Sequence, residues 1–146
     1  MKKLVLLASI FALASASSLQ AQEADSKEAE LDRTPRNCLP IVQLRRSHVI
    51  DDENIVFELR GRDYFLSQLP NRCPRLGFER SFSYATSITQ LCNVDIITVL
   101  QNFGGRISPG PSCGLGMFVP ITRDEFKALR KGEEVAIDGI EKKEGR

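Results

Sequence analysis

The sequence predicts a mainly β protein, a small antiparallel barrel or sandwich with one short C-terminal helix and two disulfides. Three observations support this prediction. Short apolar runs alternate with turn residues, a pattern typical of small all-β folds. A single helix-start signal follows the last of these runs. The 146-residue chain has four cysteines, and all of them lie among the predicted strands.

The N-terminus has the segment order of a secretory signal peptide. Residues 1–3 are a basic start, residues 4–16 are apolar and uncharged, and small residues follow. The apolar run of about 13 residues is shorter than the about 20 that a membrane span needs. We expect residues 1–21 to be removed, with Ala21 preferred over Ala16 as the cleavage site. The product is then expected to be a soluble periplasmic or secreted protein without a transmembrane span.

Charge divides the rest of the chain into three segments. Residues 22–33 hold five acidic and two basic residues and few large apolar side chains. They cannot bury enough apolar surface to offset the conformational entropy lost on folding, so we expect an acidic linker. Residues 34–130 are the expected β-rich domain, in which eleven of the twelve basic residues are arginine. Residues 131–146 are expected to be a charged, flexible tail, with residues 135–137 and Ile140 as candidates for a short edge strand.

The cysteines are even in number and widely spaced: Cys38, Cys73, Cys92 and Cys113. An oxidising compartment favours two disulfides. A zinc site is a weaker alternative, because its ligands usually come in close pairs, and a free catalytic thiol would leave an odd partner. Of three possible pairings we predict the nested one, Cys73–Cys92 inside Cys38–Cys113. The chain-entropy model gives about 3 kcal/mol for the shorter loop and about 4.5 kcal/mol for the longer one.

The expected strands are short and bounded by turns. Ile55, Phe57 and Leu59 alternate with other residues in the pattern of a half-buried strand. Other extended runs are expected at residues 39–48, 64–66, 82–84, 94–100 and 117–119. Turns are expected at residues 51–54, 61–62 and 69–74, and a long flexible connector at residues 104–116.

The one expected helix follows the last strand. Thr122 and Glu125 have the spacing of a capping box, and Ile121 with Phe126 fits the accompanying hydrophobic staple. Gly132 marks the expected end, because glycine accepts the left-handed conformation common after a helix.

No residue pattern indicates a catalytic or metal site, and no cofactor is expected. His48 is the only histidine, and a structural or exposed role fits it better than that of a catalytic base. Asp51, Asp52 and Glu53 are typical of a solvated turn. A weak divalent-cation site is the alternative interpretation, although the spacing is not that of an EF-hand.

Arginine supplies the strongest remaining signal. The candidate anion-binding residues are Arg45, Arg46, Arg75 and Arg106, because the guanidinium fork matches carboxylate and phosphate oxygens. An ordinary charged surface with salt bridges explains the same residues and is the preferred alternative. An anionic glycan, a lipid headgroup or an envelope protein is a candidate partner. Nucleic acid is not expected, since the net charge is only +1 and the compartment is wrong.

A set of short motifs occurs in a fixed order along the chain: Arg36-Asn37-Cys38, Ile50-Asp51-Asp52, Tyr64, Cys73-Pro74-Arg75-Leu76, residues 91–96 and residues 113–122. In this order, over roughly residues 36–129, they resemble an uncharacterised family of exported proteobacterial proteins, domain of unknown function 6491. That family often has glycine where Val94 stands, so the turn before Asp95 departs from it. The resemblance implies a small secreted or envelope-associated β-rich domain with paired cysteines. It implies no known activity and assigns no catalytic residue.

Two classes of function fit the sequence. We expect an exported, noncatalytic envelope module that binds a protein, a glycan or a small anion, because no nucleophile–base pair is visible. The alternative is a small periplasmic hydrolase that uses Asp51, Asp52 or Asp95 as catalytic carboxylates. Asp95 is otherwise expected to be a structural acid whose carboxylate accepts backbone N–H groups near Cys92.

Overall fold

The computed structural model describes residues 31–86, 89–138 and 140 of the chain. The predicted signal peptide, most of the predicted linker and residues 141–146 lie outside the described residues. In chain order the described elements are β1 (Cys38–Pro40), the 3-10 turn η1 (Ile41–Gln43), β2 (Leu44–Val49), β3 (Asn54–Leu59), β4 (Tyr64–Gln68), α1 (Leu76–Glu79), β5 (Phe82–Tyr84), β6 (Gln90–Cys92), β7 (Ile96–Phe103), β8 (Arg106–Gly114), β9 (Phe118–Ile121) and α2 (Arg123–Lys131).

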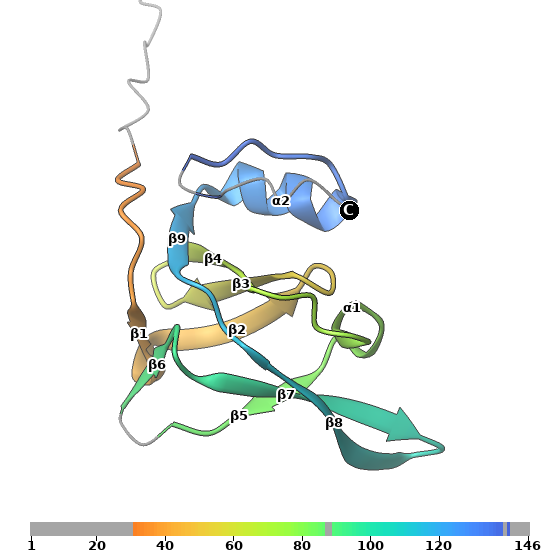
Figure 1. Ribbon diagram of the computed structural model, residues 1–146. Coiled ribbons are helices and arrows are strands. Elements are labelled where there is room, and N and C mark those ends of the chain that lie inside the picture. The colour runs from red at the N-terminus through yellow and green to blue at the C-terminus, as the bar shows by residue number, and fades with distance from the viewer. Residues whose placement is uncertain (1–30, 87–88, 139, 141–146) are drawn as a thin grey trace, which may run out of the picture.

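Across the described ranges these strands form three antiparallel sheets: β2-β3-β4-β9, β5-β7-β8 and the small ribbon β1-β6. Figure 1 shows the three-stranded sheet on one side of the four-stranded sheet and α2 on the other. The mainly β prediction with a C-terminal helix is therefore confirmed. The sheets have edges and do not close on themselves, so the sandwich, rather than the barrel, describes the fold.

The four-stranded sheet is buried on both faces. Ile55 and Phe57 of β3 point into the core shared with the other sheets, whereas Val56 points into a second core beneath α2. Phe126 of α2 closes that second core. Because both sides are covered, β3 is apolar on both faces and is more deeply buried than the half-buried pattern predicted.

The second core reaches past the predicted domain boundary at residue 130. Ile137 is buried, and Val135 and Ile140 pack against the same cluster. None of the described residues after α2 is in a strand, so the candidate edge strand does not form. The apolar side chains of this segment instead hold it to the outer face of the sheet.

β8 occupies most of the segment that was predicted to be a flexible connector. Gly104 and Gly105 have positive φ angles of 58° and 88° and turn the chain from β7 into β8. Pro109 and Pro111 are tolerated because β8 is an edge strand, where a missing N–H need not break a ladder. Gly110, Gly114 and the two prolines thus belong to an edge strand, and the prediction of a flexible connector was wrong.

Both disulfides form, and all four cysteines are paired, but the nested pairing was wrong. Cys38 bonds to Cys92 and Cys73 to Cys113, with sequence separations of 54 and 40. The β1-β6 register places Cys38 directly opposite Cys92, with a Cα–Cα distance of 4.0 Å. The number of residues between two cysteines does not reveal which residues face each other across the β1-β6 ribbon. The two closed loops interleave, so each bridge constrains the loop of the other.

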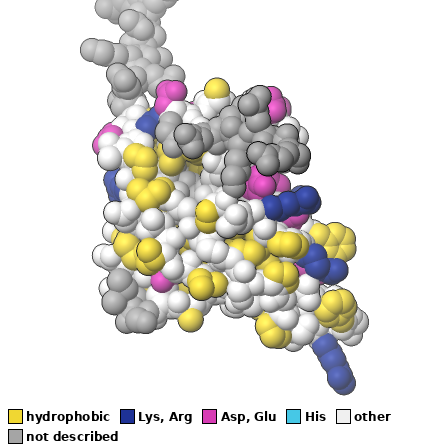
Figure 2. Space-filling view, in the orientation of Figure 1, with side chains coloured by type: hydrophobic (Ala, Val, Ile, Leu, Met, Phe, Trp, Pro, Cys, Tyr) yellow, Lys and Arg dark blue, Asp and Glu magenta, His cyan; other side chains and the backbone are white. Residues whose placement is uncertain are grey.

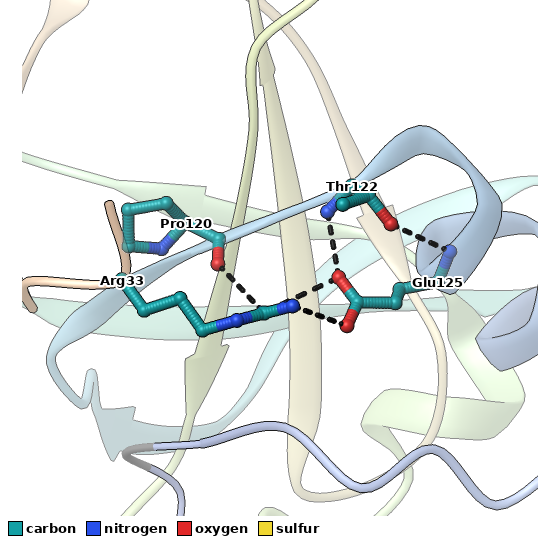
Figure 3. A network of polar contacts seen from close by, with 4 residues as sticks. All are labelled: Arg33, Pro120, Thr122 and Glu125. Atoms are coloured by element: carbon teal, nitrogen blue, oxygen red, sulfur yellow. Dashed lines mark hydrogen bonds and ion pairs between the residues drawn. The ribbon is translucent and has the colours of Figure 1, made fainter. Parts of the chain in front are cut away.

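The start of α2 is the predicted capping box. The Glu125 N–H donates to Thr122 Oγ1 at 3.2 Å, and the Thr122 N–H donates to Glu125 Oε2 at 2.7 Å. Arg33 donates to both carboxylate oxygens of Glu125, at 2.7 and 3.3 Å, and to the Pro120 carbonyl at 3.4 Å (Figure 3). The last residue of the predicted linker is therefore tied to the helix.

Replacing Cys38 and Cys92 together by serine is expected to lower the free energy of unfolding by about 4 kcal/mol, because a closed loop of this length restricts the unfolded chain. Urea unfolding of the variant and the wild type measures the loss. The matched variant, with Cys73 and Cys113 replaced by serine, removes a bridge that closes a loop of similar length and should lose a similar amount of stability. A loss below about 1 kcal/mol in both variants would contradict the assigned bracing.

The Glu125→Gln variant tests the network of Figure 3 through its pH dependence. Burial raises the pKa of the Glu125 carboxyl, but hydrogen bonds from Arg33 and Thr122 outweigh it and hold the pKa below its ordinary value of 4.5. A carboxyl of this kind stabilises the fold above its unfolded pKa and loses that contribution as the pH falls through its folded pKa. The variant should therefore lose less stability than the wild type between about pH 6 and pH 3, measured by urea unfolding. Equal losses in both proteins would contradict the network.

Candidate anion-binding groove

The structure places the four predicted arginines in three locations. Arg45 and Arg46 lie on β2, Arg75 stands immediately before α1, and Arg106 begins β8 after the hairpin turn. Arg75 pairs with Glu79, and its guanidinium lies over aromatic rings of α1 and β7. Its charge is therefore already balanced by a neighbouring carboxylate.

The hairpin side of the molecule carries arginines beside exposed apolar side chains. Figure 2 shows cationic and hydrophobic side chains interspersed along this edge, over α1 and the β7–β8 hairpin. Phe78, Phe103 and Ile107 are exposed there, with Phe78 as much as 80% exposed. The Arg75 guanidinium lies 5.5 Å from the ring centroid of Phe78 and 5.7 Å from that of Phe103. These contacts explain the position of Arg75 without a ligand.

A different set of residues lies along β2, an edge strand that, among the described strands, is hydrogen-bonded only to β3. Two adjacent hollows follow it. The first, of about 140 Å³, is lined by residues 44–47, Phe57 and Tyr84. The second, of about 260 Å³, is lined by residues 47–50, Arg80 and Arg130. Successive side chains of a strand point to opposite faces of the sheet. A hollow lined by four consecutive residues must therefore lie along the edge of the strand, where both faces can be reached.

The two hollows meet at Ser47, which lines both. The two hollows follow one another along the edge of β2, and we call them together the β2 groove. Its polar and charged members are Arg45, Arg46, Ser47, His48, Arg80, Tyr84 and Arg130.

The charge of the β2 groove is positive. Among the described residues, no carboxylate forms an ion pair with Arg80 or Arg130. The Arg80 Nε donates to a backbone carbonyl at 3.3 Å, and the Arg130 guanidinium lies 5.7 Å from the centroid of the Phe126 ring. Glu58 is an acidic neighbour of the groove, 3.5 Å from Arg45 and 3.2 Å from His48.

Arg80 reaches the groove because the β2–β3 turn holds α1 in place. Asp52 accepts the Gly77 N–H with its carboxylate at 2.8 Å and the Cys73 N–H with its carbonyl at 2.7 Å. A Cβ on Gly77 would lie 3.1 Å from the backbone of the turn, so glycine permits this close approach. Arg80 follows directly as the C-cap of α1, with a φ of 51°.

The three acids of the hydrolase alternative each bind backbone N–H groups. Asp51 Oδ1 accepts the N–H of Glu53 at 2.7 Å and that of Asn54 at 2.8 Å. Asp52 holds α1 as described, and Asp95 Oδ2 accepts the Cys92 N–H at 2.7 Å. In the described part of the chain, no three His, Cys, Asp or Glu side chains are grouped as metal ligands would be.

Sequence reasoning did not identify Arg130 and His48 as site residues. They come from α2 and β2, and Arg80 comes from α1, so the three are brought together only by the tertiary fold. No spacing along the chain signals this. Arginine enrichment of the central domain was the one signal that pointed toward such a site.

Comparisons with protein-family models, curated proteins and solved structures give no match for this chain. Membership of the uncharacterised family suggested by the motif order stays a prediction. Over the described ranges, no helix has both the length and the apolar character needed to cross a membrane. The groove is therefore interpreted from its own geometry.

The Asp52→Ala variant tests how α1 and Arg80 are positioned. It removes the acceptor of the Gly77 N–H and the partner of Arg72, which lies 2.9 Å away, and should cost about 1–3 kcal/mol of stability. Amide hydrogen exchange should show a faster-exchanging Gly77 N–H. Asp63→Ala, in the exposed β3–β4 turn, is the control and should cost no more than about 0.5 kcal/mol. An unchanged exchange rate at Gly77 would show that Asp52 does not hold the helix.

Proposed function

We propose that this chain is an exported, noncatalytic binding module whose β2 groove receives an anionic group of its partner. One observation carries the proposal: Arg80 and Arg130 line the same hollow, and no carboxylate among the described residues is paired with either. Arginine suits this role because its planar fork of donors matches the oxygens of carboxylate, phosphate and sulfate groups.

The shape of the groove supports an interaction surface. Sites for small molecules are usually clefts or cavities of about 300–1,000 Å³ that bury most of the ligand. The hollows of about 140 and 260 Å³ are smaller and lie along the outside of a sheet edge. Exposed ion pairs contribute only about 0.2–1 kcal/mol each, so useful affinity requires several contacts along the groove. A ligand with repeated anionic groups meets that requirement better than a single small ion.

The compartment is part of the same proposal. The signal-peptide pattern of residues 1–21 supports export, and two disulfides fit an oxidising environment. The partner is then a component of the cell envelope or its surroundings, as expected for the uncharacterised family that the motifs resemble.

The hydrolase alternative has less support. Asp51, Asp52 and Asp95 are each engaged with backbone N–H groups. Asp51 and Asp52 line a wide hollow beside Arg72 and Arg75, whereas Asp95 lies in the turn between β6 and β7. Carboxylates that hold turns together are poorly placed to act as acid and base on one bond.

Reversing the charge of Arg80 and Arg130 to glutamate tests the proposal. Binding of a fluorescein-labelled decamer of glutamate, measured by anisotropy at low salt, should weaken at least about tenfold, which corresponds to about 1.4 kcal/mol. Inorganic sulfate should shift the backbone amide NMR signals of residues 47–50 in the wild type. Added salt should weaken both interactions, because it screens exposed charges.

The matched control is Arg60→Glu with Arg62→Glu. It makes the same change in net charge in the exposed β3–β4 turn and should leave the affinity within about twofold. If both double variants lose affinity equally, the attraction is a property of the net charge and not of the groove. The absence of sulfate-dependent shifts at residues 47–50 would also count against the site.

A further inference from the structure

We propose that β2 is a strand-addition site, at which an extended acidic peptide segment of a partner protein becomes the fifth strand of the four-stranded sheet. This inference rests on the proposed function, since it uses the same groove and names the chemistry of the ligand. Strand addition draws its affinity from main-chain hydrogen bonds and its specificity from side chains on alternate faces.

The β2–β3 register shows which backbone groups are available. The Ile50 N–H donates to the Asn54 carbonyl at 2.9 Å, which sets the phase of the antiparallel ladder. Hydrogen-bonded and non-hydrogen-bonded pairs alternate along such a ladder, so Arg46 and His48 turn their N–H and C=O groups toward β3. The N–H and C=O groups of Ser47 and Val49 therefore point outward, into the groove.

The groove offers room on both sides of an incoming strand. A neighbouring strand would lie about 4.8 Å from β2, and its side chains would alternate between the two faces of the sheet. Tyr84 of the three-stranded sheet flanks the edge within the first hollow, and Arg130 of α2 flanks it within the second. Side chains of the added strand would thus meet different partners on its two faces.

The positive charge of the groove favours an acidic peptide over a second copy of this chain. Arg45 and Arg46 lie on the edge strand itself, and Arg80 and Arg130 lie at its far end. Glu58 pairs with Arg45, so Arg46, Arg80 and Arg130 supply most of the attraction for an acidic strand. A second copy of β2 would bring arginine against arginine, and a register shift between Leu44 and Arg46 further disrupts regular self-pairing.

The other sheet edges in the described residues are protected. Arg36 bridges to Phe118 of β9 through two backbone hydrogen bonds of 2.9 Å. β8 carries Pro109 and Pro111, and β5 is only three residues long. β2 has six residues, more than β5 or β9, lacks the prolines of β8, and exposes its central residues, which makes it the edge best able to accept a strand.

The test uses a fluorescein-labelled decapeptide of alternating threonine and glutamate, which favours an extended conformation and carries negative charge. Two further versions carry N-methyl groups on the odd or on the even peptide nitrogens, with the same charge. The unmodified peptide should bind the wild type, and one methylated version should bind at least about tenfold more weakly than the other, since only one set of N–H groups faces β2.

Amide hydrogen exchange supplies a second readout. Peptide binding should slow exchange at Ser47 and Val49, whose N–H groups face away from β3 by the phase of the ladder. Arg46 and His48 already donate to β3 and should change little. This alternation is expected of an added strand and not of an anion held by side chains.

Ser47→Pro gives a third measurement. It removes an outward N–H and leaves the β2–β3 hydrogen bonds in place, so peptide affinity should fall at least about tenfold. The methylated peptides keep the proposal testable even if this variant does not fold. Ser112→Pro, on the already proline-containing β8, is the control and should leave the affinity unchanged.

Several outcomes would overturn strand addition. Equal binding of the two methylated peptides, with sulfate shifts still present at residues 47–50, would leave the anion site standing and reject the added strand. Failure of both the peptide and sulfate to bind would reject the proposed function as well. A dimer at high concentration that Ser47→Pro abolishes would assign the edge to a second copy. Binding to phosphatidylglycerol vesicles with no affinity for the peptide would assign the groove to a lipid surface.

Discussion

Two interleaved disulfides are the constraint on which the rest of the structure depends. Cys38–Cys92 fixes the short ribbon from which the chain enters β2, and Cys73–Cys113 ties the loop before α1 to the end of β8. Because the two loops overlap along the chain, each bridge restricts a segment that lies inside the loop of the other. A body of about one hundred residues has a modest core, and covalent bracing of this kind compensates for it. Both ends of β2 lie near a bridge. Cys38 precedes β2 in the chain, and the Cys73 N–H donates to the Asp52 carbonyl in the turn after β2.

Within this frame, β2 is an edge that no second described strand covers. An exposed edge invites aggregation, and proteins usually protect it with charge, proline or a covering segment. Here β8 has prolines, β9 has the Arg36 bridge, and β2 has arginines. Arginine repels another copy of the same edge but attracts acidic groups. The feature that keeps β2 from pairing with itself would therefore also select its ligand.

Local signals in the sequence predicted local structure well. The Thr122–Glu125 capping box and the end of α2 follow from neighbouring residues, and the structure confirms them. β8 was missed because its glycines and prolines are typical of loops, and only its place at a sheet edge makes them acceptable. The disulfide pairing and the groove were missed for a related reason: Cys38 meets Cys92, and Arg80 meets Arg130, through strand register and packing between distant segments. The composition indicated an arginine-rich domain, but it could not indicate which arginines line the same hollow.

The most direct test of this account is disulfide mapping of the purified protein. Proteolysis under non-reducing conditions, followed by mass spectrometry, would identify which cysteine-containing peptides are linked. The account predicts peptides joined through Cys38–Cys92 and through Cys73–Cys113, with no free thiol. Peptides joined in the nested order, or cysteines that react with a thiol reagent before reduction, would contradict the frame that holds the sheets and the β2 edge.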